Sequence, residues 1–220
     1  MRLRIEDAAA LADASYAIHT LHAPRVDLSC PHEDVQAFVL STGVLLLPGS
    51  NSLRDYLRYN LRPLRLGTRR LKMADGATEQ GASGTFWHQG FLGYAKVVYD
   101  WLAGENIRPG AIIGHSLGAA AAQILGKTYA VPTIGFAAPR PVWDAGGVMQ
   151  QSSCLIINRA DDLVPSLPPR FHHMTTPTVL SPKHRNAYAA HKMRSYRAYL
   201  DDGSAPEHVP DHWPLEAGPA

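Results

Sequence analysis

The sequence has little of what marks a disulfide-stabilised, metal-binding or membrane-spanning protein. Its two cysteines, Cys30 and Cys154, are far apart and too few for a disulfide framework, and no Cys-x-x-Cys pair suggests a bound metal. Its apolar runs, such as the one at 44–47, are far shorter than the roughly 20 residues of a membrane-spanning helix. We therefore expect no metal site and no transmembrane segment.

The sequence also lacks a dense basic block and an N-terminal apolar run. The formal net charge is +2, and the nearest approach to a basic cluster is the short group at 69–72. Nucleic-acid binding needs many phosphate contacts, so we expect no nucleic-acid partner. The first seven residues place charges where a secretory signal needs apolar side chains. This pattern predicts a soluble, cytoplasmic protein and leaves open export without a cleaved signal.

What the sequence does contain is an alternation of short apolar runs with helical patterns. Strands are predicted at 35–40, 44–47, 111–113, 133–137 and 155–158, and helices at 6–18, 51–60, 86–102, 119–128 and 187–200. Residues 60–84 are predicted to be irregular. The alternation favours an α/β fold with a mostly parallel sheet flanked by helices. We expect a single domain over 1–201 and a flexible tail over 202–220, a segment rich in Pro, Gly and His.

The motif that carries most chemistry is Gly-x-Ser-x-Gly, formed by Gly114, His115, Ser116, Leu117 and Gly118. The pattern is short, but a buried strand is predicted before it and an alanine-rich helix after it. This is the context of the nucleophile elbow of α/β-hydrolases, in which a strained strand-to-helix turn exposes the serine hydroxyl. The start of the helix makes the Leu117 N–H a candidate donor to an oxyanion. We therefore expect Ser116 to be a nucleophile in an α/β-hydrolase fold.

The acid of a catalytic triad follows the serine along the chain in this fold. The strand predicted at 155–158 runs into Asp161 and Asp162, which places carboxylates at the end of a sheet strand. Such a carboxylate orients the imidazole of the base and stabilises its cation. From the residues alone, either aspartate satisfies this requirement.

The base is one of the histidines after this pair, which stand at positions 172, 173, 184, 191, 208 and 212. His191 is the best candidate because it lies close to the final helix, whose Tyr196 and Tyr199 can anchor it to the core. His184 is the second choice. The histidines at 208 and 212 fall in the expected tail.

Taken together, these segments resemble the class 3, fungal-type lipase family of the α/β-hydrolase superfamily. Five segments carry the likeness, in the family's order. Residues 46–57 resemble its Phe-Arg-Gly-Ser/Thr segment with the following helix, 87–91 its His-x-Gly-Phe, and 114–118 its Gly-x-Ser-x-Gly. Residues 162–169 resemble its Asp-x-Val-Pro-x-Leu-Pro-Pro, and 191–196 its His-x-x-x-x-Tyr. Each match alone is weak, and the set together is specific.

The resemblance implies a serine hydrolase that cleaves carboxylic esters, as a lipase or esterase acting on acylglycerol-like or other acyl-ester substrates through an acyl-enzyme. It implies a triad of Ser116, Asp162 and His191, and so favours Asp162 over Asp161. It also implies that Ser50 supplies an oxyanion contact beside the Leu117 N–H. No metal or organic cofactor is needed for this chemistry.

The resemblance further implies that the segment at 51–60 acts as a lid and makes transient contact with a lipid interface. Three alternatives stay open at this stage. One is a phospholipase, thioesterase or amide hydrolase of the same fold. Another is a non-catalytic protein that binds an acyl group or a partner, and the third is a protein that binds lipid surfaces through 51–60.

Overall fold

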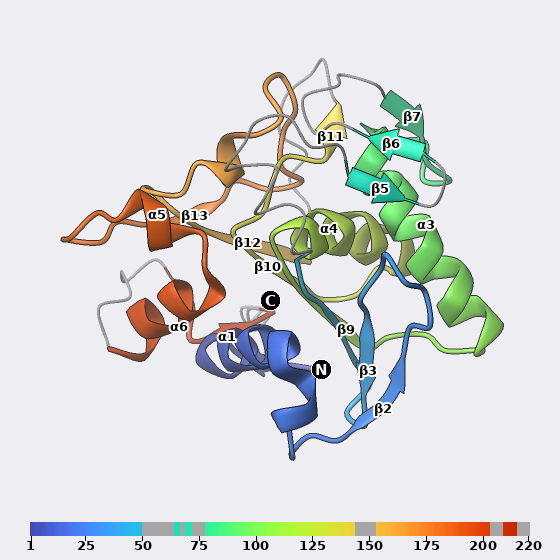
Figure 1. The fold of residues 1–220 in the computed structure, drawn as a ribbon, viewed down its shortest axis with the longest axis horizontal. Coiled ribbons are helices and arrows are strands. Elements are labelled where there is room, and N and C mark those ends of the chain that lie inside the picture. Colours follow the sequence, from blue (N-terminus) through green and yellow to red (C-terminus); the bar gives the residue numbers. More distant parts are fainter. Residues whose placement is uncertain (50–63, 67–68, 72–77, 144–152, 203–208, 215–220) are drawn as a thin grey trace, which may run out of the picture.

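A mixed sheet forms the centre of the computed structural model, which describes residues 1–49, 64–66, 69–71, 78–143, 153–202 and 209–214 (Figure 1). Within these residues the sheet has seven strands, in the spatial order β13 (Thr178–Leu180), β12 (Cys154–Arg159), β10 (Thr133–Phe136), β9 (Ala111–His115), β4 (Val44–Leu47), β3 (Phe38–Leu40) and β2 (Val26–Ser29). The strands from β13 to β4 run parallel, whereas β3 and β2 are added antiparallel at one edge. The predicted α/β fold with a mostly parallel sheet is confirmed.

Helices cover both faces of this sheet (Figure 1). The helices α3 (Gln89–Gly104) and α4 (Leu117–Tyr129) pack on one face, and α1 (Ile5–Ala14) and α6 (Met193–Asp201) pack on the other. Side chains of β4 alternate between the two cores: Leu45 and Leu47 pack with α3 and α4, while Val44 and Leu46 pack with α1 and α6. Because both faces are covered, a central strand is a continuous apolar run rather than an alternating one.

Smaller elements surround this core. They are β1 (Leu3–Arg4), which pairs with β14 (His212–Trp213); β5 (Leu64–Leu66), which pairs with β6 (Arg69–Leu71); a sheet of β7 (Thr78–Gln80), β8 (Phe86–His88) and β11 (Val142–Trp143); and the short helices η1 (Ser15–Thr20), η2 (Val164–Ser166) and α5 (Ala187–Ala190). Parts of the region predicted to be irregular therefore form strands. The helix predicted at 51–60 lies outside the described residues.

Two predicted helices differ from the observed ones in ways that matter for the site. The helix predicted at 86–102 begins only at Gln89, because the preceding residues form β8 between β7 and β11. The antiparallel strands on both sides bond with the backbone N–H and C=O groups of this aromatic segment. These hydrogen bonds favour a strand over the helix that its apolar spacing predicts. The helix predicted at 187–200 is divided into α5 and α6, with His191 as the C-cap of α5.

The predicted tail over 202–220 is described at 202 and 209–214, and its other residues lie outside the described part of the chain. Within 209–214, Trp213 pairs with Leu3 across β14 and β1 and is only 8% exposed. Its indole N–H donates to the carbonyl oxygen of Ser153 at 3.2 Å, and the N–H of Ile5 donates to the carbonyl oxygen of Asp211 at 2.9 Å. Burial of this large aromatic side chain and these two hydrogen bonds hold residues 209–214 against the core.

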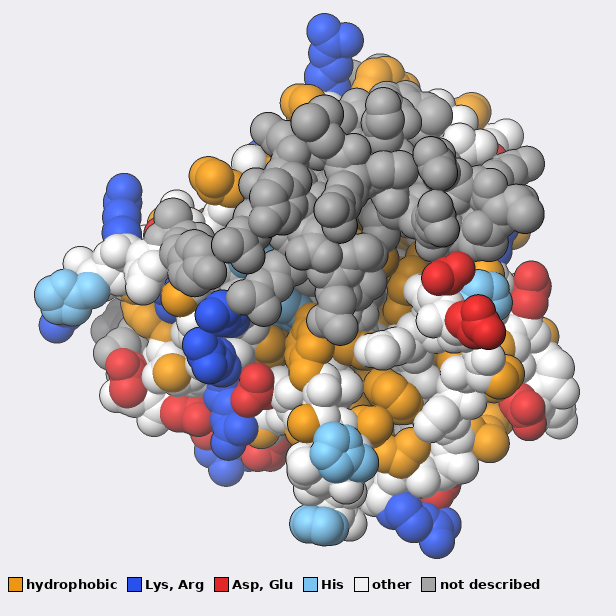
Figure 2. Space-filling view, viewed as in Figure 1, with side chains coloured by type: hydrophobic (Ala, Val, Ile, Leu, Met, Phe, Trp, Pro, Cys, Tyr) orange, Lys and Arg blue, Asp and Glu red, His pale blue; other side chains and the backbone are white. Residues whose placement is uncertain are grey.

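The surface carries charges of both signs. Figure 2 shows basic and acidic side chains lying close together on the face drawn, and the described ion pairs include Arg197 with Asp13 and with Asp201. Hydrophobic side chains are also visible between them. None of the described helices combines the length and hydropathy of a membrane span.

Replacing Trp213 tests the contribution of residues 209–214 to the stability of the fold. We expect Trp213→Ala to lower the free energy of unfolding by about 3–5 kcal/mol, because a buried aromatic side chain is lost. Urea titration followed by circular dichroism measures this. Trp143→Ala is the control, because Trp143 is 39% exposed and should lose less. Equal stability of Trp213→Ala and the wild type would contradict the assignment.

Candidate active site

The turn at Ser116 joins β9 to α4 in a strained conformation. Ser116 has φ 56° and ψ −124°, in a region that non-glycine residues rarely adopt and that costs about 1–3 kcal/mol. The turn is held by the N–H of Ser116, which donates to the carbonyl oxygen of Phe136 at 3.0 Å. Its close packing requires glycine two residues later, since a Cβ on Gly118 would lie 1.9 Å from the carbonyl oxygen of Leu47. The predicted strand-turn-helix context of this motif is therefore present.

Three segments meet at the carboxyl end of the sheet. Ser116 follows β9, Asp162 lies beyond the end of β12, and Gly49 lies beyond the end of β4. Parallel strands place their carboxyl ends at one edge, which is where open α/β sheets build their sites. Gly49 packs directly on the serine, because a Cβ on this glycine would lie 2.7 Å from the Cβ of Ser116. The fold thus gathers residues that are more than a hundred positions apart in sequence.

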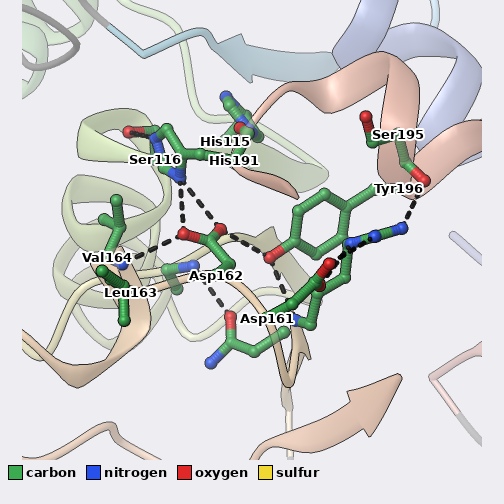
Figure 3. A network of polar contacts seen from close by, with 12 residues as sticks. His115, Ser116, Asp161, Asp162, Leu163, Val164, His191, Ser195 and Tyr196 are labelled. Carbon is green, nitrogen blue, oxygen red and sulfur yellow. Dashed lines mark hydrogen bonds and ion pairs between the residues drawn. The ribbon is translucent and has the colours of Figure 1, made fainter. Parts of the chain in front are cut away.

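Ser116, His191 and Asp162 form one line of hydrogen bonds (Figure 3). Ser116 Oγ lies 2.8 Å from His191 Nε2, and His191 Nδ1 lies 2.9 Å from Asp162 Oδ2 and 3.2 Å from Asp162 Oδ1. The Ser116 residue is 2% exposed, and the Asp162 side chain is 1% exposed. In this arrangement the histidine ring can accept a hydrogen bond from the serine hydroxyl at Nε2 and donate one to the carboxylate at Nδ1.

Of the two predicted oxyanion donors, Leu117 lies among the described residues. Leu117 is the first residue of α4, and the first N–H groups of a helix have no acceptor within the helix. Its N–H therefore stands beside the serine at the positive end of the helix dipole. Ser50 lies outside the described residues, although Gly49 before it contacts the serine.

Solved structures of fungal lipases resemble this architecture. The lipase of Rhizomucor miehei in its propeptide complex is 18% identical with a TM-score of 0.51, lipase II of Rhizopus niveus is 16% identical with 0.52, and a lipase of Yarrowia lipolytica is 18% identical with 0.54. The matches cover 79%, 80% and 79% of this chain and 66%, 79% and 76% of the three lipases. No protein-family model and no curated protein sequence matches the chain.

This chain has the α/β-hydrolase fold. The chain spans just under two thirds of the Rhizomucor lipase, so the likeness concerns the common core of the fold. At these sequence identities the likeness establishes the architecture alone, because one fold hosts many kinds of chemistry.

In this α/β-hydrolase fold, two further donors hold Asp162 in place. The N–H of Val164 donates to Oδ1 at 3.0 Å, and the hydroxyl of Tyr196 donates to Oδ2 at 2.8 Å. Burial and the charge of Asp162 raise the pKa of Tyr196 well above its ordinary value, so Tyr196 stays protonated and acts as a donor. The sequence predicts Tyr196 as a core anchor near His191. The hydrogen bond from Tyr196 to Asp162 depends on the tertiary fold and has no signal in the sequence.

Asp161 has a different partner, which separates the two aspartates that the residues alone left open. The Arg159 guanidinium donates to Oδ1 and Oδ2 of Asp161 at 3.1 and 3.0 Å, and the N–H of Asn186 donates to Oδ2 at 2.9 Å. Burial acts to raise the pKa of Asp161, but Arg159 and the Asn186 N–H outweigh it and lower the pKa below its usual value. Asp161 therefore anchors the loop before α5 and does not contact the histidine ring of the site.

The other candidate bases lie elsewhere. His184 is exposed on the loop before α5, and His212 belongs to β14. His173 is buried, with Nε2 3.2 Å from the carbonyl oxygen of Pro165, and burial lowers its pKa to about 4. Among the described histidines of the C-terminal half, His191 is the one whose ring contacts Ser116.

One residue at the site had no sign in the sequence. Tyr16, in η1, places its hydroxyl 2.5 Å from Nδ1 of His115, the residue before the serine. The segment was predicted as a plain amphipathic helix, and α1 in fact ends at Ala14. Local pattern carries no signal for this contact, because its two partners are 99 positions apart.

Replacing Asp161 tests the division between the two aspartates. We expect Asp161→Asn to lower the free energy of unfolding by about 3–5 kcal/mol near neutral pH, because Arg159 then lacks its buried partner. The lowered pKa means that the ionised carboxylate stabilises the fold above the unfolded value of 3.8, and that this stability is lost as the pH falls through the folded pKa. Urea titrations in steps from about pH 7 down to about pH 2 should therefore show the difference shrinking at the acidic end.

The control for this experiment is Asp27→Asn. Asp27 pairs with Arg25 at the surface, where both side chains are well exposed, so its loss should change stability by less than about 1 kcal/mol. A difference between Asp161→Asn and the wild type that stays constant over this pH range would contradict the assignment.

Proposed function

We propose that this chain is a serine hydrolase that cleaves carboxylic esters, with Ser116 as nucleophile, His191 as general base and Asp162 as the acid that orients it. The observation that carries the proposal is the continuous hydrogen-bonded line from Ser116 Oγ through both ring nitrogens of His191 to Asp162, with distances of 2.8 and 2.9 Å. The same geometry activates serine for acyl transfer on unrelated folds. The resemblance in fold to fungal lipases supports it.

The reaction begins when Ser116 Oγ attacks the carbonyl carbon of the ester and its proton passes to His191 Nε2. Asp162 stabilises the imidazolium that forms, because its carboxylate accepts a hydrogen bond from the N–H at Nδ1. The tetrahedral intermediate then breaks its C–O bond to the alcohol, which takes the proton from His191 and leaves an acyl-enzyme. Water attacks the acyl group, gives a proton to His191, and the carboxylic acid is released as Ser116 recovers its proton.

The oxyanion of each tetrahedral intermediate needs donors that are in place before the reaction. The Leu117 N–H is one, at the start of α4. We assign the second to Ser50, since Gly49 immediately before it packs against Ser116. The proposed triad and water supply every proton transfer of the cycle, and the two donors stabilise the charge of the oxyanion, so the chemistry needs no cofactor.

We further infer that the substrates carry apolar acyl or alcohol groups, as in acylglycerols. Leu163 is 72% exposed and directly follows Asp162, so an apolar side chain stands at the surface beside the proposed triad (Figure 3). The likeness in fold to solved fungal lipases supports lipophilic esters and transient contact with a lipid interface. Phospholipid and thioester hydrolysis use the same groups, and a substrate panel separates them.

Ester hydrolysis by wild type and Ser116→Ala is the decisive test. We expect the wild type to hydrolyse p-nitrophenyl butyrate or p-nitrophenyl palmitate, with a ratio that separates an esterase from a lipase. Ser116→Ala should lose about a million-fold in kcat, as serine hydrolases do without their nucleophile. Labelling by a fluorophosphonate should vanish with it.

Ser29→Ala, at an exposed position of β2, is the matched control and should keep full activity. A wild type that neither hydrolyses these esters nor reacts with the fluorophosphonate would overturn the proposal. The non-catalytic binding function would then take its place.

Replacing Asp162 tests the role of the acid separately. We expect Asp162→Asn to lower kcat by about 10⁴-fold, because the amide favours the wrong tautomer of His191 and cannot stabilise its cation. Asp161→Asn should retain most of its kcat below its melting temperature. Steady-state kinetics on the preferred ester measures both, and similar losses in the two variants would contradict the assignment of the acid.

A further inference from the structure

A second line of hydrogen bonds runs behind the proposed triad. The N–H of Gly49 donates to the hydroxyl oxygen of Tyr16 at 2.8 Å. The Tyr16 hydroxyl lies 2.5 Å from His115 Nδ1, and His115 Nε2 lies 3.0 Å from the carbonyl oxygen of His191. The line therefore joins the segment after β4 to the backbone of the histidine that contacts the serine.

When His115 is neutral, one placement of protons satisfies every bond in this line. The Gly49 N–H is a donor, so the oxygen of Tyr16 accepts from it and the single hydroxyl proton of Tyr16 goes to His115 Nδ1. His115 then carries its own proton on Nε2 and donates it to the carbonyl oxygen of His191. Each partner thus fixes the role of the next.

The protonation states of the two side chains agree with this arrangement. Burial, with a smaller effect from His191, lowers the pKa of His115 well below its ordinary value. Tyr16 as a whole is 44% exposed, but its hydroxyl oxygen is enclosed beside His115 and Gly49, and this local burial raises the pKa of Tyr16. Both groups are therefore neutral at neutral pH, and His115 adds no positive charge beside the imidazolium that forms on His191 during the proposed reaction.

The line contacts the reacting residues at two places. Gly49 fits between Tyr16 and Ser116, since a Cβ on it would lie 2.7 Å from both the Tyr16 hydroxyl oxygen and the Ser116 Cβ. At the other end, the rings of His115 and His191 lie 5.2 Å apart and 36° from parallel. His191 lies between the end of α5 and the start of α6, so no continuous helix fixes its backbone.

We propose that Tyr16 and His115 are positioning residues that set the backbone of His191 and of Gly49 relative to Ser116. The proposal rests on the ester hydrolase function proposed above. Tyr16 comes from η1, so the N-terminal segment, far from the elbow in sequence, determines the geometry of acyl transfer. A misplacement of less than an ångström at either contact lengthens the path of the proton from Ser116 to His191 or shifts Gly49 against the serine, and such errors lower kcat.

The first experiment removes one hydroxyl. Tyr16→Phe keeps the ring and loses both hydrogen bonds of its oxygen. We expect kcat to fall about tenfold or more, the effect of one well-placed hydrogen bond in the transition state, with KM changed less than about twofold. The rate of fluorophosphonate labelling should fall in parallel, since it depends on the same attack by Ser116.

The matched control is Tyr94→Phe. Tyr94 lies in α3, is 1% exposed, and donates its hydroxyl proton to the carbonyl oxygen of Gln36 at 2.7 Å, away from the site. Both variants lose a tyrosine hydroxyl bonded to the backbone or to a buried partner, so both should melt at a lower temperature. Only Tyr16→Phe should lose kcat, and this separates positioning from a general loss of stability.

A second pair of variants tests the link from His115 to His191. The side-chain amide of glutamine places its nitrogen near the position of Nε2, whereas that of asparagine stops near Nδ1. We expect His115→Gln to keep a donor to the His191 carbonyl and to retain at least about fivefold more kcat than His115→Asn. Both variants are compared by thermal melting, so that only folded protein is assayed.

The outcomes distinguish this inference from the proposed function. Labelling that is absent in the wild type would overturn the proposed function. A wild type that labels and turns over, beside a Tyr16→Phe variant with unchanged kcat, would overturn the positioning role alone. Equal kcat losses in Tyr16→Phe and Tyr94→Phe, or equal kcat in the glutamine and asparagine variants, would overturn it as well.

Discussion

Close backbone packing at the carboxyl ends of β4 and β9 is the constraint on which the rest of the site depends. A Cβ on Gly114 would lie 2.6 Å from the carbonyl oxygen of Gly118, and one on Gly118 would collide with Leu47. This packing holds Ser116 at a positive φ and turns its side chain away from the sheet. The strain at that residue persists because the surrounding backbone leaves no alternative path. The hydrogen bonds of the site then only need to bring partners to a serine whose position is already set.

Those partners reach the serine from separate layers of the fold, and each is held by more than one bond. Asp162 accepts from Val164 and Tyr196 as well as from His191, so its carboxylate is oriented before any reaction. The neighbouring aspartate is committed to Arg159, which keeps a second negative charge away from the imidazole. Two adjacent residues of the same type thus differ in role because the chain turns between them and presents them to different neighbours.

Much of this arrangement could be predicted from the sequence, and the reasons are local. The apolar runs of β4, β9, β10 and β12 indicate buried parallel strands, and the glycines around Ser116 indicate a tight turn before a helix. The exceptions are equally physical. The segment at 86–88 has helical spacing but pairs with a strand on each side. Trp213 lies in a stretch of polar and helix-breaking residues, yet its side chain is buried in the core. Both outcomes depend on partners distant in sequence, which no local pattern records.

The sequence by itself determined the α/β architecture, the serine in the strand-turn-helix motif and the order of the proposed nucleophile, acid and base along the chain, because these follow from periodicity and from short motifs. The choice between Asp161 and Asp162 was suggested by family resemblance, and the tertiary structure supplied its physical basis by placing one against His191 and the other against Arg159. Tyr16 entered the site only through the fold. Its hydroxyl meets His115 because α1 and η1 pack across the sheet from α4, and such a contact between segments far apart in sequence is a property of the packed chain rather than of any stretch of it.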